Sequence, residues 1–136
     1  MPDNFQTNPS AYGKNAFAGL VSYTPVVLTT ATDVYVDWER GNRQLLTLTG
    51  DVNIYFANPA DGTYHLLIEQ QGDYVVTWKV NDTDLPTVAW VEGTAPVVTT
   101  GGTVSAPIYD TFSFSYWKEK GLYVGMCTQN CKVPTA

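Results

Sequence analysis

The chain has few charged residues and few of the residue types that catalytic and metal sites use most. Of its 136 residues only 15% are charged, with 7 Lys and Arg against 13 Asp and Glu, and it has one histidine and two cysteines. The net charge of −6 leaves no basic patch that would release counterions from nucleic-acid phosphates or from anionic lipid. No apolar run approaches the roughly 18 residues of a membrane-spanning helix. We therefore expect no nucleic-acid partner and no membrane partner.

The length of the chain limits the number of domains it can form. A chain of 136 residues has the size of one ordinary domain and is long enough to bury a core without a metal or a disulfide framework. Its first residues, Met1–Gln6, have neither the basic start nor the apolar centre of a secretory signal. We therefore expect the protein to reach the outside of a cell or particle, if it does so, by lysis or assembly.

Short stretches of alternating apolar and polar residues begin at about residue 19 and continue along the chain. Val34, Val36 and Trp38 alternate with polar neighbours, and Glu39–Asn42 supplies turn residues before the next β-rich stretch, which predicts a hairpin. Similar stretches recur at a spacing of about 8–12 residues, without a convincing helical period. We predict an all-β fold, namely an antiparallel β-sandwich of jelly-roll type with about eight or nine strands over residues 19–136.

Residues 1–18 differ from the rest because they follow neither the strand period nor the helix period. Prolines, a glycine and asparagines interrupt the segment, yet three aromatic residues are spread along it: Phe5, Tyr12 and Phe17. Two interpretations stay open. The segment is either a frayed terminus or an arm whose aromatic side chains bind a neighbouring protein and become ordered there.

No recognisable catalytic or metal-binding motif is present, so we predict that the protein is not an enzyme and has no cofactor. His65 is out of phase with Leu66 and Ile68 and has no nucleophile elbow or similar signature near it, which favours an exposed sheet histidine over a catalytic one. The Asn81–Asp84 segment offers a few oxygen atoms, but it lacks the ligand spacing and the glycine of a calcium loop. An ordinary polar loop is favoured there.

Two cysteines, Cys127 and Cys131, form a Cys-x-x-x-Cys arrangement near the end of the chain. With one distant histidine they fall short of the four ligands of a closed zinc site. A local disulfide and two free thiols both stay open. Aromatic residues make up 13% of the chain, and of the tryptophans only Trp117, beside a charged turn, is expected at the surface.

Several segments follow one another in a characteristic order. A threonine-rich strand ends in a glycine turn, a glutamine–glycine turn precedes a Val-Thr-Trp strand, and a Trp-x-x-Gly-x-x-Pro segment precedes an aspartate that leads an aromatic strand. The segments are residues 47–54, 58–62, 66–78, 88–96, 110–114 and 123–125. Their order resembles a recurring module of tailed bacteriophages over roughly residues 33–125. The longer 79–85 loop and the cysteine-containing end depart from that module and leave the partner-binding face open.

The resemblance implies a β-sandwich virion protein rather than an enzyme. Members of this family occur on capsid surfaces as decoration (cement) proteins and in tail fibres as trimeric tip or stem domains. Because the chain starts at Met1 and has neither heptads nor a stalk, we expect a decoration protein on the capsid surface of the virion. It would form a homotrimer, bind the major capsid protein, and use Phe5, Tyr12 and Phe17 as capsid contacts.

The alternative function is a tail-associated receptor-binding or fibre-tip module that recognises host surface glycan. Such a module needs exposed aromatic side chains in loops, which Tyr109, Trp117 and residues 81–86 would supply.

Overall fold

The computed structural model describes residues 24–80 and 87–134. Along much of its strands, buried and more exposed side chains alternate, as the sequence pattern predicts. In β4, for example, Gln44, Leu46 and Leu48 are buried and alternate with more exposed neighbours. The strands are β2 (Val26–Leu28), β3 (Asp33–Asp37), β4 (Arg43–Leu48), β5 (Val52–Ala57), β6 (Gly62–Gln70), β7 (Val76–Val80), β8 (Thr87–Ala89), β9 (Ile108–Trp117) and β10 (Leu122–Cys131). Two short 3₁₀ turns, η1 (Trp38–Arg40) and η2 (Val91–Gly93), complete the elements. The predicted all-β class is confirmed.

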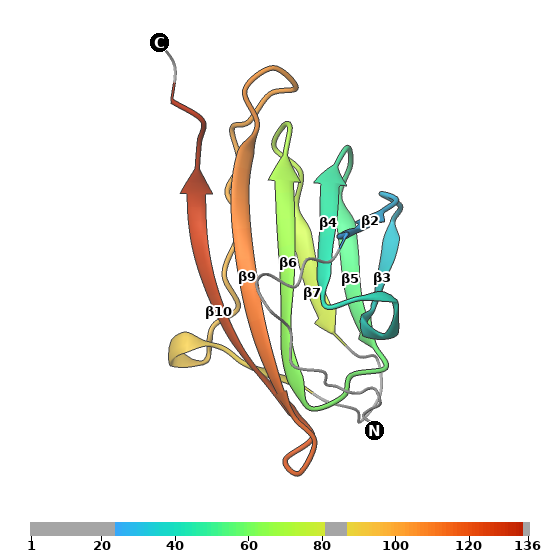
Figure 1. Cartoon of the computed structure of the whole chain (residues 1–136). Helices are drawn as coiled ribbons and strands as arrows, with labels where there is room; N and C mark the ends of the chain where they lie inside the picture. The colour runs from blue at the N-terminus through green and yellow to red at the C-terminus, as the bar shows by residue number, and fades with distance from the viewer. Residues whose placement is uncertain (1–23, 81–86, 135–136) are drawn as a thin grey trace, which may run out of the picture.

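The strands form two sheets that lie one behind the other (Figure 1). The larger sheet has six strands in the order β2-β4-β6-β9-β10-β8, and the smaller sheet has three strands in the order β3-β5-β7. From β2 to β7 the chain alternates between the sheets, because even-numbered strands join the larger sheet and odd-numbered strands the smaller one. Both sheets therefore gain strands in step along the sequence.

Most neighbouring strands are parallel, so the predicted antiparallel pairing is wrong for most of the fold. Five pairs are parallel, namely β2–β4, β4–β6, β3–β5, β5–β7 and β8–β10, whereas β6–β9 and β9–β10 are antiparallel. Val26 pairs with Gln44, and Gln44 pairs with Leu66, so partners in this region are about twenty residues apart. Parallel neighbours need a crossover between them rather than a tight hairpin. From β2 to β7 the crossover is a strand of the other sheet, whereas β8 and β10 are joined through η2 and β9. The antiparallel order of a jelly roll does not describe this fold.

The hairpin predicted between β3 and β4 is instead a crossing between the sheets. Asp37 ends β3 and accepts a hydrogen bond from the Glu39 N–H of η1 through Oδ1 at 3.0 Å. The Gln44 amide then donates to the carbonyl oxygens of Asp37 and Gly41 at 2.8 and 2.9 Å. These bonds hold a wide turn after which β4 joins the other sheet. A hairpin and a crossing give the same alternation along each strand, so the sequence pattern does not separate them.

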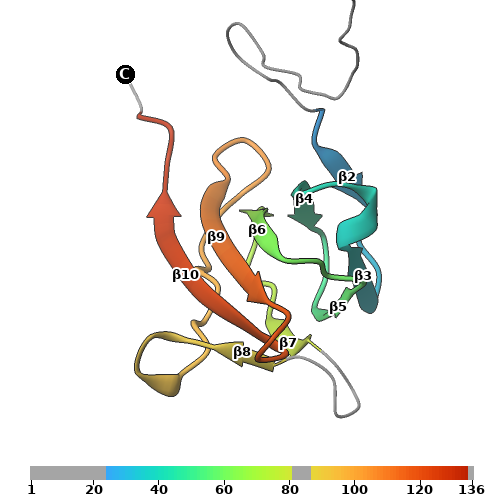
Figure 2. The same ribbon diagram turned by 60° about the horizontal axis from the view of Figure 1, so that its bottom comes forward.

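Aromatic rings fill the space between the sheets and join them through one core. Phe56 of β5 packs edge-on against Phe114 of β9, with ring centroids 4.8 Å apart. The larger sheet curls until β8 lies near β7 (Figure 2). The ring of Trp78 in β7 packs against that of Trp90, just after β8, with the ring centroids 5.4 Å apart. Burying a large apolar side chain contributes about 1.5–3 kcal/mol. Trp38 is buried, and Trp78 and Trp90 are half-buried against the same core. Of these three tryptophans only Trp78 lies within a strand, while Trp38 is in η1 and Trp90 follows β8.

The predicted boundary between an arm (1–18) and a folded domain (19–136) lies outside the described residues. The first described strand begins at Val26.

Candidate functional site

The six-stranded sheet buries one face in the core and presents its other face, called the outer face below, away from it. On the three central strands β4, β6 and β9 the inward side chains are buried, and the outward ones are partly or fully exposed. The outward side chains are Arg43, Leu45, Thr47, Thr63, His65, Leu67, Glu69, Tyr109, Thr111, Ser113, Ser115 and Trp117. The outer face is therefore rich in hydroxyl and aliphatic groups and has Glu69 as its single carboxylate on these strands.

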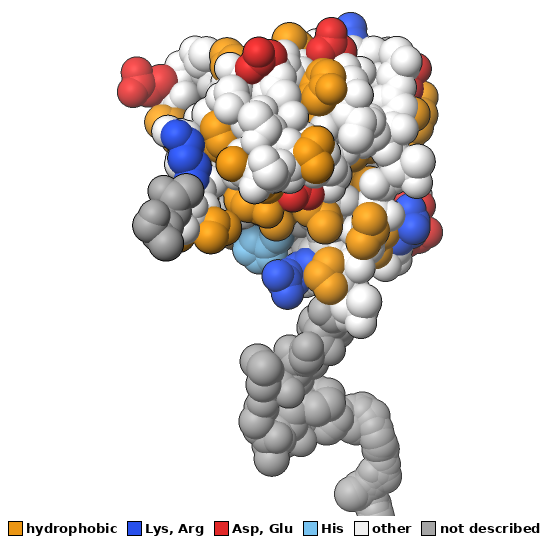
Figure 3. Space-filling model, turned by 90° about the horizontal axis from the view of Figure 1, so that it is seen from above, with side chains coloured by type: hydrophobic (Ala, Val, Ile, Leu, Met, Phe, Trp, Pro, Cys, Tyr) orange, Lys and Arg blue, Asp and Glu red, His pale blue; other side chains and the backbone are white. Residues whose placement is uncertain are grey.

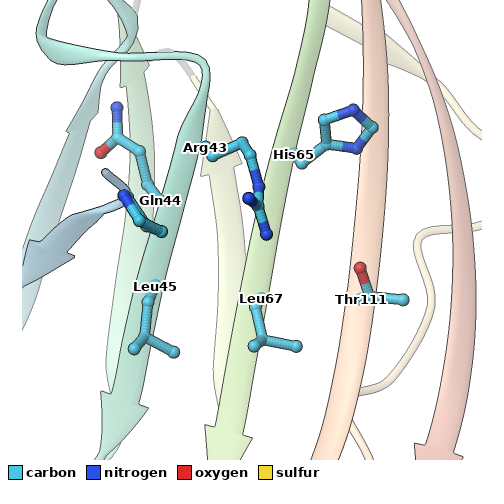
Figure 4. Close-up of a pocket in the computed structure, with 7 residues that line it drawn as sticks. Arg43, Gln44, Leu45, His65, Leu67 and Thr111 are labelled. Carbon is cyan, nitrogen blue, oxygen red and sulfur yellow. The ribbon is translucent and has the colours of Figure 1, made fainter. Parts of the chain in front are cut away.

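A pocket of about 540 Å³ opens on this face, and we refer to it as the hollow. It is lined by Pro25, Arg43, Gln44, Leu45, His65, Leu67 and Thr111. The parallel register of β4 and β6 places Arg43 beside His65 and Leu45 beside Leu67. Figure 4 shows the Arg43 side chain reaching across β6 above Leu67. A volume of this size lies within the range of about 300–1,000 Å³ found for ligand pockets.

Arg43 and His65, which lie side by side in the hollow, form a local basic site on an acidic protein. Among the residues that the structure describes, the Arg43 side chain forms no ion pair or hydrogen bond. Figure 3 shows hydrophobic side chains gathered around the single histidine, with a basic side chain beside it. The site therefore combines the positive charge of Arg43, which has no carboxylate partner within residues 24–80 and 87–134, with the aliphatic side chains of Leu45 and Leu67.

His65 and Ser113 come closest to a catalytic pair on the outer face. The His65 Nδ1 lies 3.1 Å from the Ser113 Oγ, and the two residues are register partners on β6 and β9. Each of these strands is paired on both sides, so their backbone N–H groups are used by the sheet and are not free to stabilise an oxyanion. The pair therefore has the geometry of a surface hydrogen bond. The exposure of His65 agrees with its predicted phase.

Glu69 is held by two neighbours on the outer face. Its Oε1 accepts a hydrogen bond from the Thr47 hydroxyl at 2.7 Å, and its Oε2 accepts one from the Tyr109 hydroxyl at 3.1 Å. Partial burial, together with the hydrogen bond and the negative charge of Glu69, raises the pKa of Tyr109. Tyr109, considered above as a loop aromatic, thus lies within β9 with its hydroxyl engaged.

A second hollow, of about 360 Å³, lies at the far end of β9 beside the turn to β10. It is lined in part by Asp61, Trp117, Lys118 and Glu119. Trp117 is 57% exposed, and its Nε1 donates to the Ser115 Oγ at 3.1 Å. The Lys118 N–H donates to Asp61 Oδ1. Trp117 is the exposed tryptophan that the sequence predicted.

The remaining predicted site residues are not brought into either hollow. Phe5, Tyr12 and Phe17, as well as the Asn81–Asp84 segment, lie outside the described residues. Cys127 and Cys131 lie on β10, where both are exposed and free. Partial burial of its thiol, followed by the charge of Asp110, raises the pKa of Cys127. Within residues 24–80 and 87–134, no cluster of three or more His, Cys, Asp or Glu side chains is placed to hold a metal ion.

Sequence reasoning did not identify Arg43 as a lining residue of the hollow. The alternation within each strand already placed Arg43 and Leu45 on one side of β4, and His65 and Leu67 on one side of β6. What the sequence did not indicate was that β4 and β6 are parallel neighbours in a register that aligns the two pairs. A predicted hairpin would have placed these residues in different surroundings.

Comparisons with protein-family models, curated proteins and solved structures found no match to this chain. In the part of the chain that the structure describes, no helix has the length and apolar character needed to span a membrane.

Proposed function

We propose that this protein is a capsid decoration protein of a tailed bacteriophage that binds the capsid exterior as a homotrimer. The observation that carries the binding role is the outer face, which presents hydroxyl and aliphatic groups with one carboxylate on its central strands. A mixed apolar and polar surface that is poor in charge suits contact with another protein. The phage assignment draws its support from the ordered segments between residues 33 and 125.

In this proposal the two sheets and their shared core constitute a β-sandwich, and residues 1–18 are the arm that contacts the major capsid protein. Phe5, Tyr12 and Phe17 would each contribute about 1.5–3 kcal/mol on burial, less the cost of ordering the segment. Three arms on one trimer would raise the overall avidity without new kinds of contact. The antiparallel jelly-roll order is not part of the proposal, because most strand pairs are parallel.

Labelling virions with an antibody against this protein tests the location. Label spread evenly over the heads is the expected result, and label confined to the tail would contradict it. Deleting residues 2–15 should abolish capsid binding and leave the folded domain intact, because the described core lies between Leu28 and Tyr123. Retained capsid binding by the truncated protein would refute the role of the arm.

A second candidate function, recognition of host surface glycan by a tail-associated module, is favoured by one observation. Trp117 is exposed beside a hollow whose lining includes carboxylates and a lysine, and such a site offers a ring for stacking together with polar groups for orientation. Binding to a host glycan that is lost in Trp117→Ala would favour this function. Tyr35, which is 59% exposed on the smaller sheet, provides the matched control as Tyr35→Ala.

A further inference from the structure

The spacing of the residues in the hollow matches the spacing of alternate side chains on an extended peptide. Arg43 and His65 form one row, and Leu45 and Leu67 form the next row, two residues further along both strands. Residues two apart on a strand lie roughly 6.6 Å from each other and point to the same side. An extended segment running along β4 and β6 would therefore place side chains i and i+2 over the two rows.

The charges favour an acidic group over the first row. Arg43 has no acidic partner among the described residues. Glu69, the outward carboxylate of the three central strands, is already bound by Thr47 and Tyr109. A carboxylate placed over the first row would satisfy the Arg43 guanidinium through a charge-assisted hydrogen bond. An aromatic or aliphatic side chain two positions away would cover Leu45 and Leu67.

The chain itself contains such a segment close at hand. Residues 1–23 include a single carboxylate side chain, Asp3, and Phe5 follows it two positions later. The described chain begins at Thr24, and Pro25 is part of the wall of the hollow. Phe5 precedes Pro25 by about 20 residues in the sequence, and a chain of that length spans at most roughly 70 Å when fully extended. Such a tether gives a local concentration on the order of millimolar, far above that of a second copy in dilute solution.

We propose that Asp3 and Phe5 bind in the hollow of the same molecule, with the Asp3 carboxylate on Arg43 and the Phe5 ring on Leu45 and Leu67. This inference goes beyond the proposed function, because it concerns the isolated protein and requires no capsid. Its test can fail while capsid binding holds, and the reverse is equally possible. It also means that one of the three arm aromatics is held by its own domain until a partner displaces it.

The single histidine provides the measurement, because the ring-proton NMR signals of His65 need no assignment against other histidines. Phe5→Ala should shift these signals relative to the wild-type chain at constant pH, because it removes an aromatic ring from the row of side chains next to His65 on β6. Phe17→Ala, the same substitution in the same segment, is the matched control and should leave them in place. Identical His65 signals in wild type and Phe5→Ala would overturn the proposal.

A charge exchange tests the contact between Asp3 and Arg43. In the Arg43→Asp background, Phe5→Ala should no longer move the His65 signals, because the segment is released. Adding Asp3→Lys to Arg43→Asp should restore the effect of Phe5→Ala, and failure of this rescue would count against the pairing. Wild-type signals that change with protein concentration, together with a dimer mass in sedimentation, would overturn docking within the same molecule.

Discussion

Replacing Asp110 by Asn should strongly destabilise the domain, although the side chain keeps its shape. Asp110 lies on β9, is 1% exposed and faces the core side of the sheet. Its Oδ2 accepts hydrogen bonds from the Thr99 N–H at 2.7 Å and from the Gln129 amide at 3.0 Å, and its Oδ1 accepts one from the Asn130 N–H at 2.8 Å. The carboxylate thus ties the segment before β9 to the irregular part of β10.

The magnitude follows from these three donors. An Asn side chain has one oxygen, so at least one of the three N–H groups would face the new amide N–H₂ group and lose its acceptor. A hydrogen bond to a charged group is worth about 1.5–3 kcal/mol, and an unsatisfied buried donor adds its desolvation cost. The substitution also removes the desolvation penalty of the buried charge, which offsets part of this loss in stability. We expect a net loss of about 3 kcal/mol, which at this chain length lowers Tm by roughly 10 °C.

Thermal and urea unfolding followed by circular dichroism measure this loss. Asp61→Asn is the matched control, because Asp61 is exposed and accepts one backbone hydrogen bond, from Lys118, that an amide oxygen can also accept. We expect the control to cost less than about 0.5 kcal/mol, as for most surface substitutions. A loss below about 1 kcal/mol in Asp110→Asn would show that relief of charge burial outweighs the hydrogen bonds, and it would refute the reasoning.

Three further predictions concern other positions. Gly102→Ala should lower the free energy of unfolding in urea several times more than Gly50→Ala. A Cβ atom at Gly102 would overlap the Gln70 carbonyl oxygen, whereas a Cβ atom at Gly50 would have no atom within 4 Å. Equal losses in the two variants would contradict the packing around Gly102. Tyr123→Phe should be neutral or stabilising by up to about 1 kcal/mol. Burial raises the pKa of the Tyr123 hydroxyl, against a smaller lowering by the Trp38 indole, and this hydroxyl has no hydrogen bond of normal geometry within the described residues. A clear loss of Tm would show that the hydroxyl has a partner. Both cysteines of the native protein should react with a thiol reagent, because both are exposed and free. Cys127 should react more slowly at pH 8 than a free cysteine, because its raised pKa lowers the thiolate fraction. Mass spectrometry of the modified peptides over time measures both rates, and a thiol that stays unmodified would contradict the prediction.

The strands could be predicted from the sequence, but their pairing could not. Alternation in Val34–Val36 and in Gln44–Leu48 reports that one side of each strand is buried, and the structure confirms it. Alternation does not report which strand lies alongside, because a hairpin and a crossing between two sheets bury the same residues. In the structure the chain crosses between the sheets at the turn after β3, where the Gln44 amide donates to the carbonyl oxygens of Asp37 and Gly41.

The candidate site was predictable only in part for the same reason. The exposure of His65 and Trp117 follows from local phase and from neighbouring charges, and both are exposed in the structure. The hollow depends on residues from β4, β6 and β9 that are far apart in the sequence. Its basic row exists only because Arg43 and His65 share one register position, and that register is a property of the whole sheet.

The alternation of β2 to β7 between the sheets has a consequence for how this chain tolerates changes in length. Each step of about twenty residues adds one strand to each sheet, much as one coil adds to a solenoid. An insertion of a whole step would widen both sheets and leave the thickness of the core unchanged. An insertion of a single residue within a strand would instead turn its buried side chains outward. Viable length variants should therefore differ by whole coils or within the turns between strands.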